Sequence, residues 1–419
     1  MSVRQKLVSM SKMCYNRIYM LKLNTNDFTK HIRIRRGMSK KVILVVISSM
    51  LLVTAVSFGV TWWYHSSEQS NSLKQSAKTM QDALQTMTGV KNADQLPLKT
   101  AADQKPLVPT IAQDGTKQFT LTAEPIRWEY QKGKSIVAWA FNGQVPGPEI
   151  RVTEGDKVRI TFTNKLPRPT TIHWHGLDLP NSMDGVPGVT QAAVKPGETF
   201  TYEFTATPAG TRFYHTHGSG VADEAQQSDM GLSGAFIVEP KGYVKPDKEY
   251  TVVLDDWLKG EGSFNNAVLG MDQTNGGMSM NMNYNLFTMN GLAYPDTTPL
   301  TVKKGDKVRI RIINASASTS HPMHLHGQQF KIVAIDGNPV PVAAQLTRNV
   351  VTVNPGETYD IEFTATNEGI WAFHCHELHH SAAGMMTLLK YDGYIAPMPT
   401  PPVSPAGSSS QPSMPGMNM

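Results

Sequence analysis

Hydrophobic and polar positions alternate along much of this chain, in short stretches separated by Gly, Pro and Asn. Residues 157–163, Lys-Val-Arg-Ile-Thr-Phe-Thr, show the pattern clearly. A period of two that places β-branched and aromatic residues on one side is typical of half-buried β-strands. From Gln118 to about Tyr391 the pattern therefore predicts an all-β body.

One long apolar run breaks this pattern near the start. Residues 42–64 carry no charge and, at about 1.5 Å per helical residue, would cross a bilayer core of about 30 Å. The basic flank before this run keeps the N-terminus cytoplasmic by the positive-inside rule. We expect a single-pass anchor in the cell membrane, with the rest extracytoplasmic. A cleaved signal peptide fits less well, because the run is long and no small-residue cleavage site follows Tyr64. A start at Met38 would leave this topology unchanged.

The β body contains an internal repeat. Residues 152–160 return as 302–310, and the Pro-Gly-Glu-Thr turn in 194–200 returns in 353–359. Two copies of one domain, each the size of a Greek-key β-sandwich, are expected, with no room for a third. The predicted order is a basic arm, a transmembrane helix, a stalk, domain 1, a linker, domain 2 and a Pro/Ser/Met tail: 1–41, 42–64, 65–117, 118–240, 241–283, 284–392 and 393–419.

Charge argues against a nucleic-acid partner. The net charge is +5, but residues 1–41 hold eleven Lys/Arg against one acid, so subtracting their +10 leaves −5 on the remaining chain. The basic excess thus belongs to the N-terminal arm and not to the folded body.

Histidines follow the repeat. Two residues apart on a strand, two imidazoles share one face and can bind one metal. A single pair of this kind would suit an ordinary surface or core position, but four pairs at equivalent places argue for metal sites. Ten of the 13 histidines belong to these clusters: His173 and His175; His215 and His217; His321, His324 and His326; His374, His376 and His380.

Cys375 lies between His374 and His376, so its sulfur points to the opposite face of a strand. The only other cysteine, Cys14, belongs to the N-terminal arm, so no disulfide is expected. Two His, one thiolate and a weak axial Met form a blue-copper electron-transfer site, and the spacing supplies His321, Cys375, His380 and Met385. Zinc, the competing metal, prefers a closed tetrahedral set without a thioether.

These motifs, in this order, resemble the four copper signatures of the multicopper oxidases, and residues 141–148 resemble a segment that precedes the first signature. With two cupredoxin-like Greek-key β-sandwich domains and the blue site in the second, the chain is most similar to the small two-domain laccases. The resemblance implies four coppers. Type 1 would use His321, Cys375, His380 and Met385; type 2 would use His173 and His324; the type 3 pair would use His175, His215, His217, His326, His374 and His376. His379 is left as a bystander beside His380.

The resemblance also implies a function. A laccase-like oxidoreductase would oxidise phenols or aromatic amines at the type 1 copper and reduce O2 to water at the trinuclear cluster. Asp184 matches the family's acidic position and would relay protons, although Asp184-Gly185 could be an ordinary turn. The resemblance to the small laccases also implies a homotrimer in which each cluster is built between neighbouring subunits. The alternative is a cluster closed within one subunit.

Methionines leave the substrate open. A Gly/Asn-rich loop and the tail carry thioethers, which suit Cu(I), so a cuprous oxidase in copper tolerance is an alternative to phenol oxidation. Met is also an adaptable filler of flexible segments. The residues concerned are Met271, Met278, Met280, Met282, Met289, Met398, Met414, Met417 and Met419. A copper nitrite reductase or a copper or electron carrier would not need the type 3 histidines.

Overall fold

The computed structural model describes residues 93–258, 271–272, 277–278 and 284–395. All of them belong to one compact unit, Thr79–Met419. The predicted arm, the predicted anchor and nearly all of the tail lie outside these residues, as do most of the stalk and of the Met-rich loop. No helix within the described ranges is long and apolar enough to cross a membrane.

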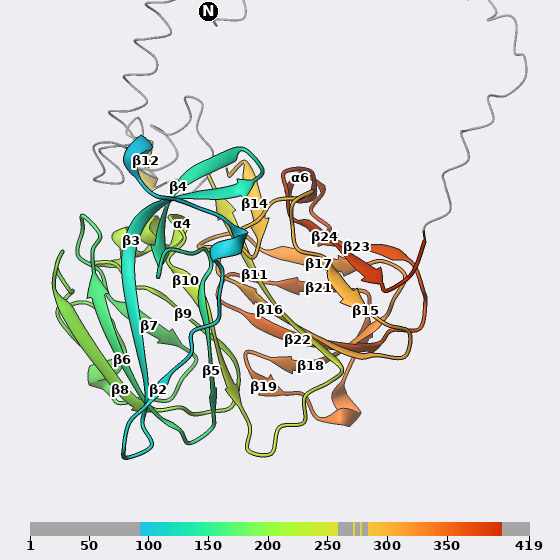
Figure 1. Cartoon of the computed structure of the whole chain (residues 1–419), viewed down its shortest axis with the longest axis horizontal. Helices are drawn as coiled ribbons and strands as arrows, with labels where there is room; N and C mark the ends of the chain where they lie inside the picture. Colours follow the sequence, from blue (N-terminus) through green and yellow to red (C-terminus); the bar gives the residue numbers. More distant parts are fainter. Residues whose placement is uncertain (1–92, 259–270, 273–276, 279–283, 396–419) are drawn as a thin grey trace, which may run out of the picture. The chain divides into compact units, whose positions relative to one another are not determined.

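The first repeat forms two sheets, coloured blue to green in Figure 1, that share one core. One sheet has the order β1-β3-β6-β8, with β2 and β4 also paired to β3: β1 (Leu98–Lys99), β2 (Thr110–Ile111), β3 (Lys117–Gln131), β4 (Lys134–Phe141), β6 (Lys157–Asn164) and β8 (Thr199–Thr205). The other has the order β5-β10-β9-β7: β5 (Gly147–Thr153), β7 (Ile172–His175), β9 (Gly210–Thr216) and β10 (Ser233–Glu239). Buried Trp174, Tyr214 and Phe236 fill the space between the sheets.

The second repeat has the same plan, in yellow to red in Figure 1. Its first sheet runs β14-β11-β16-β22-β18-β19, with β20 paired to β18: β11 (Lys248–Trp257), β14 (Leu286–Met289), β16 (Lys307–Asn314), β18 (Phe330–Ile335), β19 (Asn338–Pro339), β20 (Thr347–Arg348) and β22 (Thr358–Thr364). Its second runs β15-β24-β23-β17-β21: β15 (Leu300–Val302), β17 (His321–Leu325), β21 (Val350–Val353), β23 (Ile370–Cys375) and β24 (Met386–Tyr391).

The prediction of an all-β body is confirmed. After the exposed Lys157, β6 alternates buried and partly buried positions, as the sequence pattern requires for a strand with one face on a core. The described helices are short: α4 (Val221–Asp229), α6 (Leu378–Ala382) and the 3-10 turns η1 (Ala93–Gln95), η2 (Ala101–Asp103), η3 (Asn181–Met183) and η4 (Val342–Ala344). A small hairpin of β12 (Met271–Asp272) and β13 (Gly277–Met278) lies in the predicted Met-rich loop.

Two predicted boundaries were wrong. The end of the stalk, 65–117, contains β1 and β2, which pair with β3 and belong to domain 1. Each has two residues, too few to show a period. The linker, 241–283, contains β11, which pairs with both β16 and β14 and belongs to domain 2. The last six residues of β11 are all buried, so its sequence does not alternate as a half-exposed strand would.

The two domains are joined by buried polar contacts. The Arg311 guanidinium lies 2.9 Å from the Asp360 carboxylate and donates to the Thr211 hydroxyl at 2.7 Å. Thr211 donates in turn to Asp360 at 2.6 Å. Because Thr211 lies on β9 and Asp360 on β22, these bonds tie a strand that carries His215 to the second domain.

Candidate metal centres

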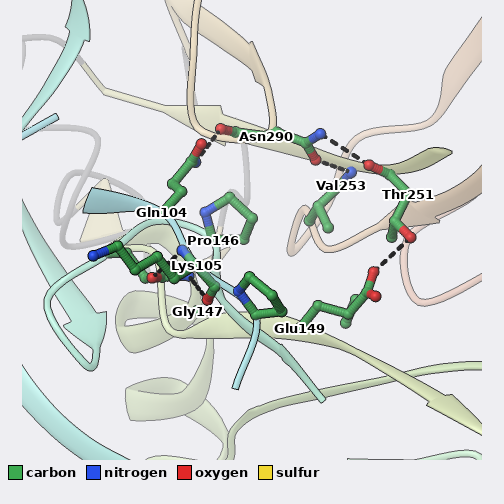
Figure 2. A pocket seen from close by; sticks show the side chains of 11 residues that line it. Gln104, Lys105, Pro146, Gly147, Glu149, Thr251, Val253 and Asn290 are labelled. Atoms are coloured by element: carbon green, nitrogen blue, oxygen red, sulfur yellow. Dashed lines mark hydrogen bonds between the residues drawn. The ribbon is translucent and has the colours of Figure 1, made fainter. Parts of the chain in front are cut away.

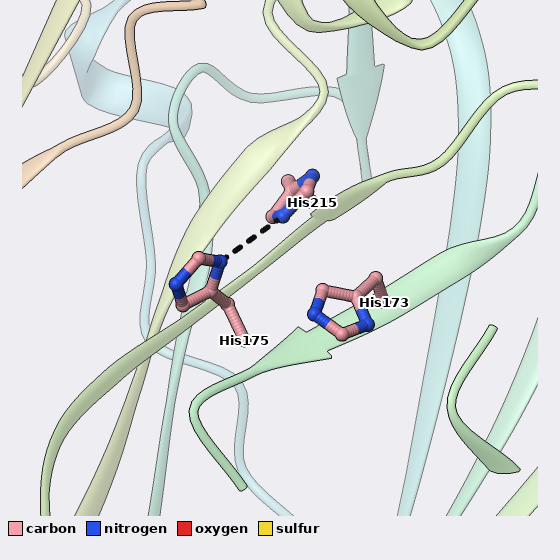
Figure 3. A group of neighbouring side chains, drawn as sticks. All are labelled: His173, His175 and His215. Carbon is pink, nitrogen blue, oxygen red and sulfur yellow. Dashed lines mark hydrogen bonds between the residues drawn. The ribbon is translucent and has the colours of Figure 1, made fainter. Parts of the chain in front are cut away.

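Four histidines gather at one end of the first domain. β7 and β9 pair in antiparallel register with His173 opposite His215, so the side chains of His173, His175 and His215 come together (Figure 3). One ring nitrogen from each of the three lies within 4.8 Å of the other two. His217 joins them, with its ring centroid 5.8 Å from that of His173. These four side chains are named the domain 1 cluster below.

Backbone oxygens contact one ring nitrogen of His173 and one of His215. His173 Nδ1 lies 2.8 Å from the Asp184 carbonyl and 3.3 Å from its carboxylate. His215 Nδ1 lies 2.7 Å from the Thr216 carbonyl. Gly185 allows the close turn, because a Cβ there would lie 1.9 Å from the Ile172 carbonyl oxygen. Such contacts fix which nitrogen carries the proton and leave the opposite lone pair for a metal.

The second domain repeats the arrangement. β17 and β23 pair with His324 opposite His374, and His326 Nε2 lies 3.0 Å from His374 Nε2. His376 lies with its ring centroid 5.5 Å from that of His324. These four side chains, of His324, His326, His374 and His376, are named the domain 2 cluster below. His326 and His376 are exposed, whereas His374 is buried.

The two clusters are separate. Ring contacts between cluster histidines in the described structure join members of the same cluster only. The sets of converging ring nitrogens likewise divide by domain. Each domain therefore presents four histidines. The eight predicted for a trinuclear cluster do not come together in the described part of the chain.

A third donor set lies on the other side of β23. Cys375 Sγ is 3.7 Å from His321 Nδ1 and 3.6 Å from His380 Nδ1. Cys375 and His321 are fully buried. Met385 is also fully buried, and its carbonyl accepts the Cys375 N–H at 3.0 Å. The four residues predicted for a type 1 copper thus lie together, and the strand alternation puts their sulfur opposite the two flanking imidazoles.

The protonation of these donors suits a metal cation. Burial raises the pKa of the Cys375 thiol to about 12, so the proton leaves only when a cation replaces it. Burial, followed by the neighbouring imidazoles, lowers the pKa of His215 to about 3 and that of His175 to about 4. These imidazoles are neutral near pH 7 and offer their lone pairs. A His2Cys set with a buried thioether beside it suits copper better than zinc.

Two carboxylates that sequence reasoning missed lie against these sites. Glu224, on α4, lies 3.2 Å from His217 Nδ1. Asp256, on β11, lies 3.0 Å from His321 Nε2. For Asp256 the sequence did contain a signal, namely two acidic residues at the buried end of an apolar strand. For Glu224 it contained none, because the contact of α4 with His217 depends on the tertiary fold. His379 is exposed on α6, as expected.

A cavity of about 300 Å³ opens elsewhere, where the domains meet (Figure 2). None of the predicted ligands lines it. The Gln104 amide donates to the carbonyls of Val145 and Asn290, at 2.7 and 2.8 Å, and Thr251 donates to Glu149 at 2.7 Å. Its polar lining is largely satisfied by bonds within the protein.

Comparison with known proteins agrees with these donor sets. Two family models, both described as multicopper oxidase, match residues 122–242 and 270–392. The chain is 33% identical to copper resistance protein A of Escherichia coli, over 55% of this chain and 45% of that protein. It is 32% identical to Laccase-15 of Oryza sativa subsp. japonica, over 60% and 42%. A blue copper oxidase structure from Nitrosomonas europaea matches with TM-score 0.57 and 35% identity, over 65% and 85%.

The chain spans about half the length of the curated relatives it matches. Both β domains match the same family, however, and the two matches together cover more than half of the 419 residues. Copper is the cofactor of this family. The chain therefore belongs to the multicopper oxidases, copper-dependent oxidoreductases that use O2.

Proposed function

We propose that this protein is a laccase-like oxidase that takes electrons one at a time from phenols or aromatic amines and reduces O2 to water. The observation that carries the proposal is the position of Cys375. It joins a buried thiol site on one side of the chain to His374 on β23 and to His376 just after β23, two residues of the domain 2 cluster. Copper at these sites would supply one-electron transfer and the reduction of O2.

The chain's own residues define where a substrate would act. His380 is half-buried on α6, next to exposed Leu378, while Phe287 stacks on its ring at a centroid distance of 4.0 Å. The His380 imidazole is thus partly exposed to solvent, while the Cys375 thiol behind it is fully buried. An aromatic donor could thus approach the imidazole without reaching Cys375.

The proposal includes a homotrimer. Each domain presents half of the required histidines, and two members of the domain 2 cluster are exposed. A neighbouring copy that brings its domain 1 cluster to this surface would complete the set of eight, as a closed ring of heterologous contacts allows. Asp184, held against His173, would relay protons there.

We also propose that residues 42–64 anchor the protein in the cell membrane with both β domains outside. The support is the length of the uncharged run and its basic flank. Protease treatment of intact cells should remove the β domains and leave a membrane-bound fragment. Protection of the domains from protease would contradict this topology.

Oxidation of Cu(I) is the second candidate. The methionines near 271–282 and in the tail favour it, and two relatives are named copper resistance protein A. Met289, by contrast, is a buried core residue and is not available as a ligand. A nitrite reductase or an electron carrier fits less well, because neither uses two sets of four cluster histidines.

The test is O2 uptake by the copper-loaded protein with a phenol or with Cu(I). Uptake of four electrons per O2, lost in His374→Ala, is expected for an oxidase, and the better donor identifies the substrate class. A blue protein without uptake would contradict the proposal in favour of a carrier.

Subunit sharing has its own test. His217→Ala and His376→Ala should each abolish uptake, but co-expression should restore about a quarter of it, because one random subunit contact in four is intact on both sides. A cluster closed within one subunit would give no restoration.

A further inference from the structure

A fully buried carboxylate faces the predicted type 1 site. Asp256 and His321 are both 0% exposed, and the Asp256 carboxylate lies 3.0 Å from His321 Nε2. The other ring nitrogen, Nδ1, is the one that faces Cys375. Neither of the two buried atoms, His321 Nε2 and Asp256 Oδ1, forms a hydrogen bond in the described structure, so they face each other as a close charged contact. A carboxylate at this distance favours a proton on Nε2, which leaves Nδ1 for the metal.

Asp256 is fixed from its other side by a serine. The Ser316 hydroxyl donates to the Asp256 carboxylate at 2.7 Å and itself accepts the Thr319 N–H at 3.0 Å. With its lone pair used by the backbone, the hydroxyl directs its proton at Asp256. Ser316 and Thr319 belong to the loop that leads into β17, whose first residue is His321. One carboxylate therefore holds both a metal ligand and the loop before it.

The first domain serves as an internal comparison. The Ala315 N–H donates to the Leu254 carbonyl, and the Lys165 N–H donates to the Ala123 carbonyl, which aligns the two repeats at this point. Counting from these residues, Pro125 stands in place of Asp256 and Leu166 in place of Ser316. Thr170 stands in place of His321. The domain without the thiolate site thus also lacks the carboxylate and its serine.

The neighbouring residue, Asp255, provides a contrast. It is equally buried, and its carboxylate accepts the Asp256 N–H at 2.9 Å. Burial, with Asp256 and Asp229 nearby, raises the pKa of Asp255 well above the usual range of an aspartate. No contact joins Asp255 to His321 in the described structure.

We propose that Asp256 is a positioning residue that holds His321 in the tautomer with Nδ1 toward copper, and that its negative charge lowers the reduction potential of the type 1 centre. The proposal rests on a blue copper bound at His321, Cys375 and His380. A negative charge in a medium of low dielectric stabilises Cu(II) relative to Cu(I). Without the Asp256 carboxylate, the His321 imidazole would still be a copper ligand but would no longer have a negative charge beside its Nε2.

The experiment is a redox titration of the copper-loaded full chain, followed at the blue absorption band. Asp256→Asn keeps the shape and removes the charge, so the Cu(II)/Cu(I) equilibrium should shift at least tenfold toward Cu(I), which is about 59 mV for one electron. Asp255→Asn should shift it less than about twofold, because Asp256, and not Asp255, contacts His321. An unchanged potential in Asp256→Asn would overturn the proposal.

Ser316→Ala separates charge from structure. It removes a donor from the carboxylate but keeps the charge, so the potential should fall, opposite in sign to Asp256→Asn. If both variants raise the potential, Asp256 acts only through packing and the proposal fails. Should Asp256→Asn not hold copper, the sign in Ser316→Ala decides alone. A wild-type protein without a blue band would refute the proposed function itself.

Discussion

The same place in the two domains holds two different pockets. In the second domain, Cys375 Sγ faces His321 and His380. In the first, the Thr216 hydroxyl lies 2.8 Å from the Thr170 hydroxyl and donates to the side-chain amide oxygen of Gln227 at 2.9 Å. Thr216 lies between His215 and His217, as Cys375 lies between His374 and His376.

The backbone shows that these pockets correspond. The Cys375 N–H donates to the Met385 carbonyl, and the Thr216 N–H donates to the Leu232 carbonyl. Gln227 lies on α4 and His380 on α6, each on the helix that follows the histidine strand. In the first pocket every polar group has a partner of its own. In the second, nitrogen and sulfur lone pairs converge, which is favourable only around a cation. One β-sandwich thus makes either a hydrogen-bonded core or a metal site, and the side chains decide which.

The largest effect is expected from replacing Cys375 in the second pocket with threonine, the residue that the first pocket has at this place. Cys375→Thr removes the thiolate, so the blue absorption should vanish and O2 uptake should fall by more than the roughly 100-fold that loss of an outer-shell partner costs. Absorption and uptake assays check this. The histidine clusters remain, so near-ultraviolet absorption should persist. A variant that stays blue would mean that another ligand holds the copper.

The reverse exchange should create a site. Thr170→His, Thr216→Cys, Gln227→His and Leu232→Met together place the second ligand set on the first scaffold, and about one further copper per chain is expected. Metal analysis and absorption of this variant in a Cys375→Thr background would show the new centre alone. The matched control replaces Thr216 with Ser, which gives no thiolate. No added copper in a folded protein would mean that the helix positions differ too much.

The sequence predicted the ligands better than the surroundings. The spacing of His374, Cys375 and His376 needs only the alternation of a strand, a local property, and the repeat predicted the second copy. The contacts of Asp256 and Glu224 depend on which strand or helix returns to the site, and no periodic pattern specifies that. β11 was not predicted as part of domain 2, because a strand buried on both faces has no alternation of polar and apolar residues to detect.

A smaller effect is expected from opening the hydrogen-bonded pocket. Thr216→Val leaves the Thr170 hydroxyl and the Gln227 carbonyl without a shared partner, so the free energy of unfolding should fall by about 1–3 kcal/mol. Urea denaturation measures it. Thr387→Val is the control, since Thr387 donates to a single carbonyl, at 2.9 Å, and its loss should cost less. The blue band should be unaffected in both. A change in the band would connect the two pockets in a way that the contacts do not suggest.

The last effect appears only as a dependence on pH and concerns α4, the helix beside the first pocket. Asp229, at the end of α4, accepts the Tyr284 hydroxyl of the second domain at 2.8 Å, and burial raises its pKa to about 7. Between pH 4 and 7 the unfolded chain releases this proton and the folded protein keeps it, so wild-type stability falls as the pH rises. Asp229→Asn has no such proton. Its stability relative to wild type should therefore rise over this interval, by at most about 4 kcal/mol, and level off above pH 7. Thermal denaturation at several pH values measures it. Tyr284→Phe removes the bond that favours the charged carboxylate and should steepen the wild-type dependence. A pH-independent difference would mean that Asp229 is already ionised in the folded protein at pH 4.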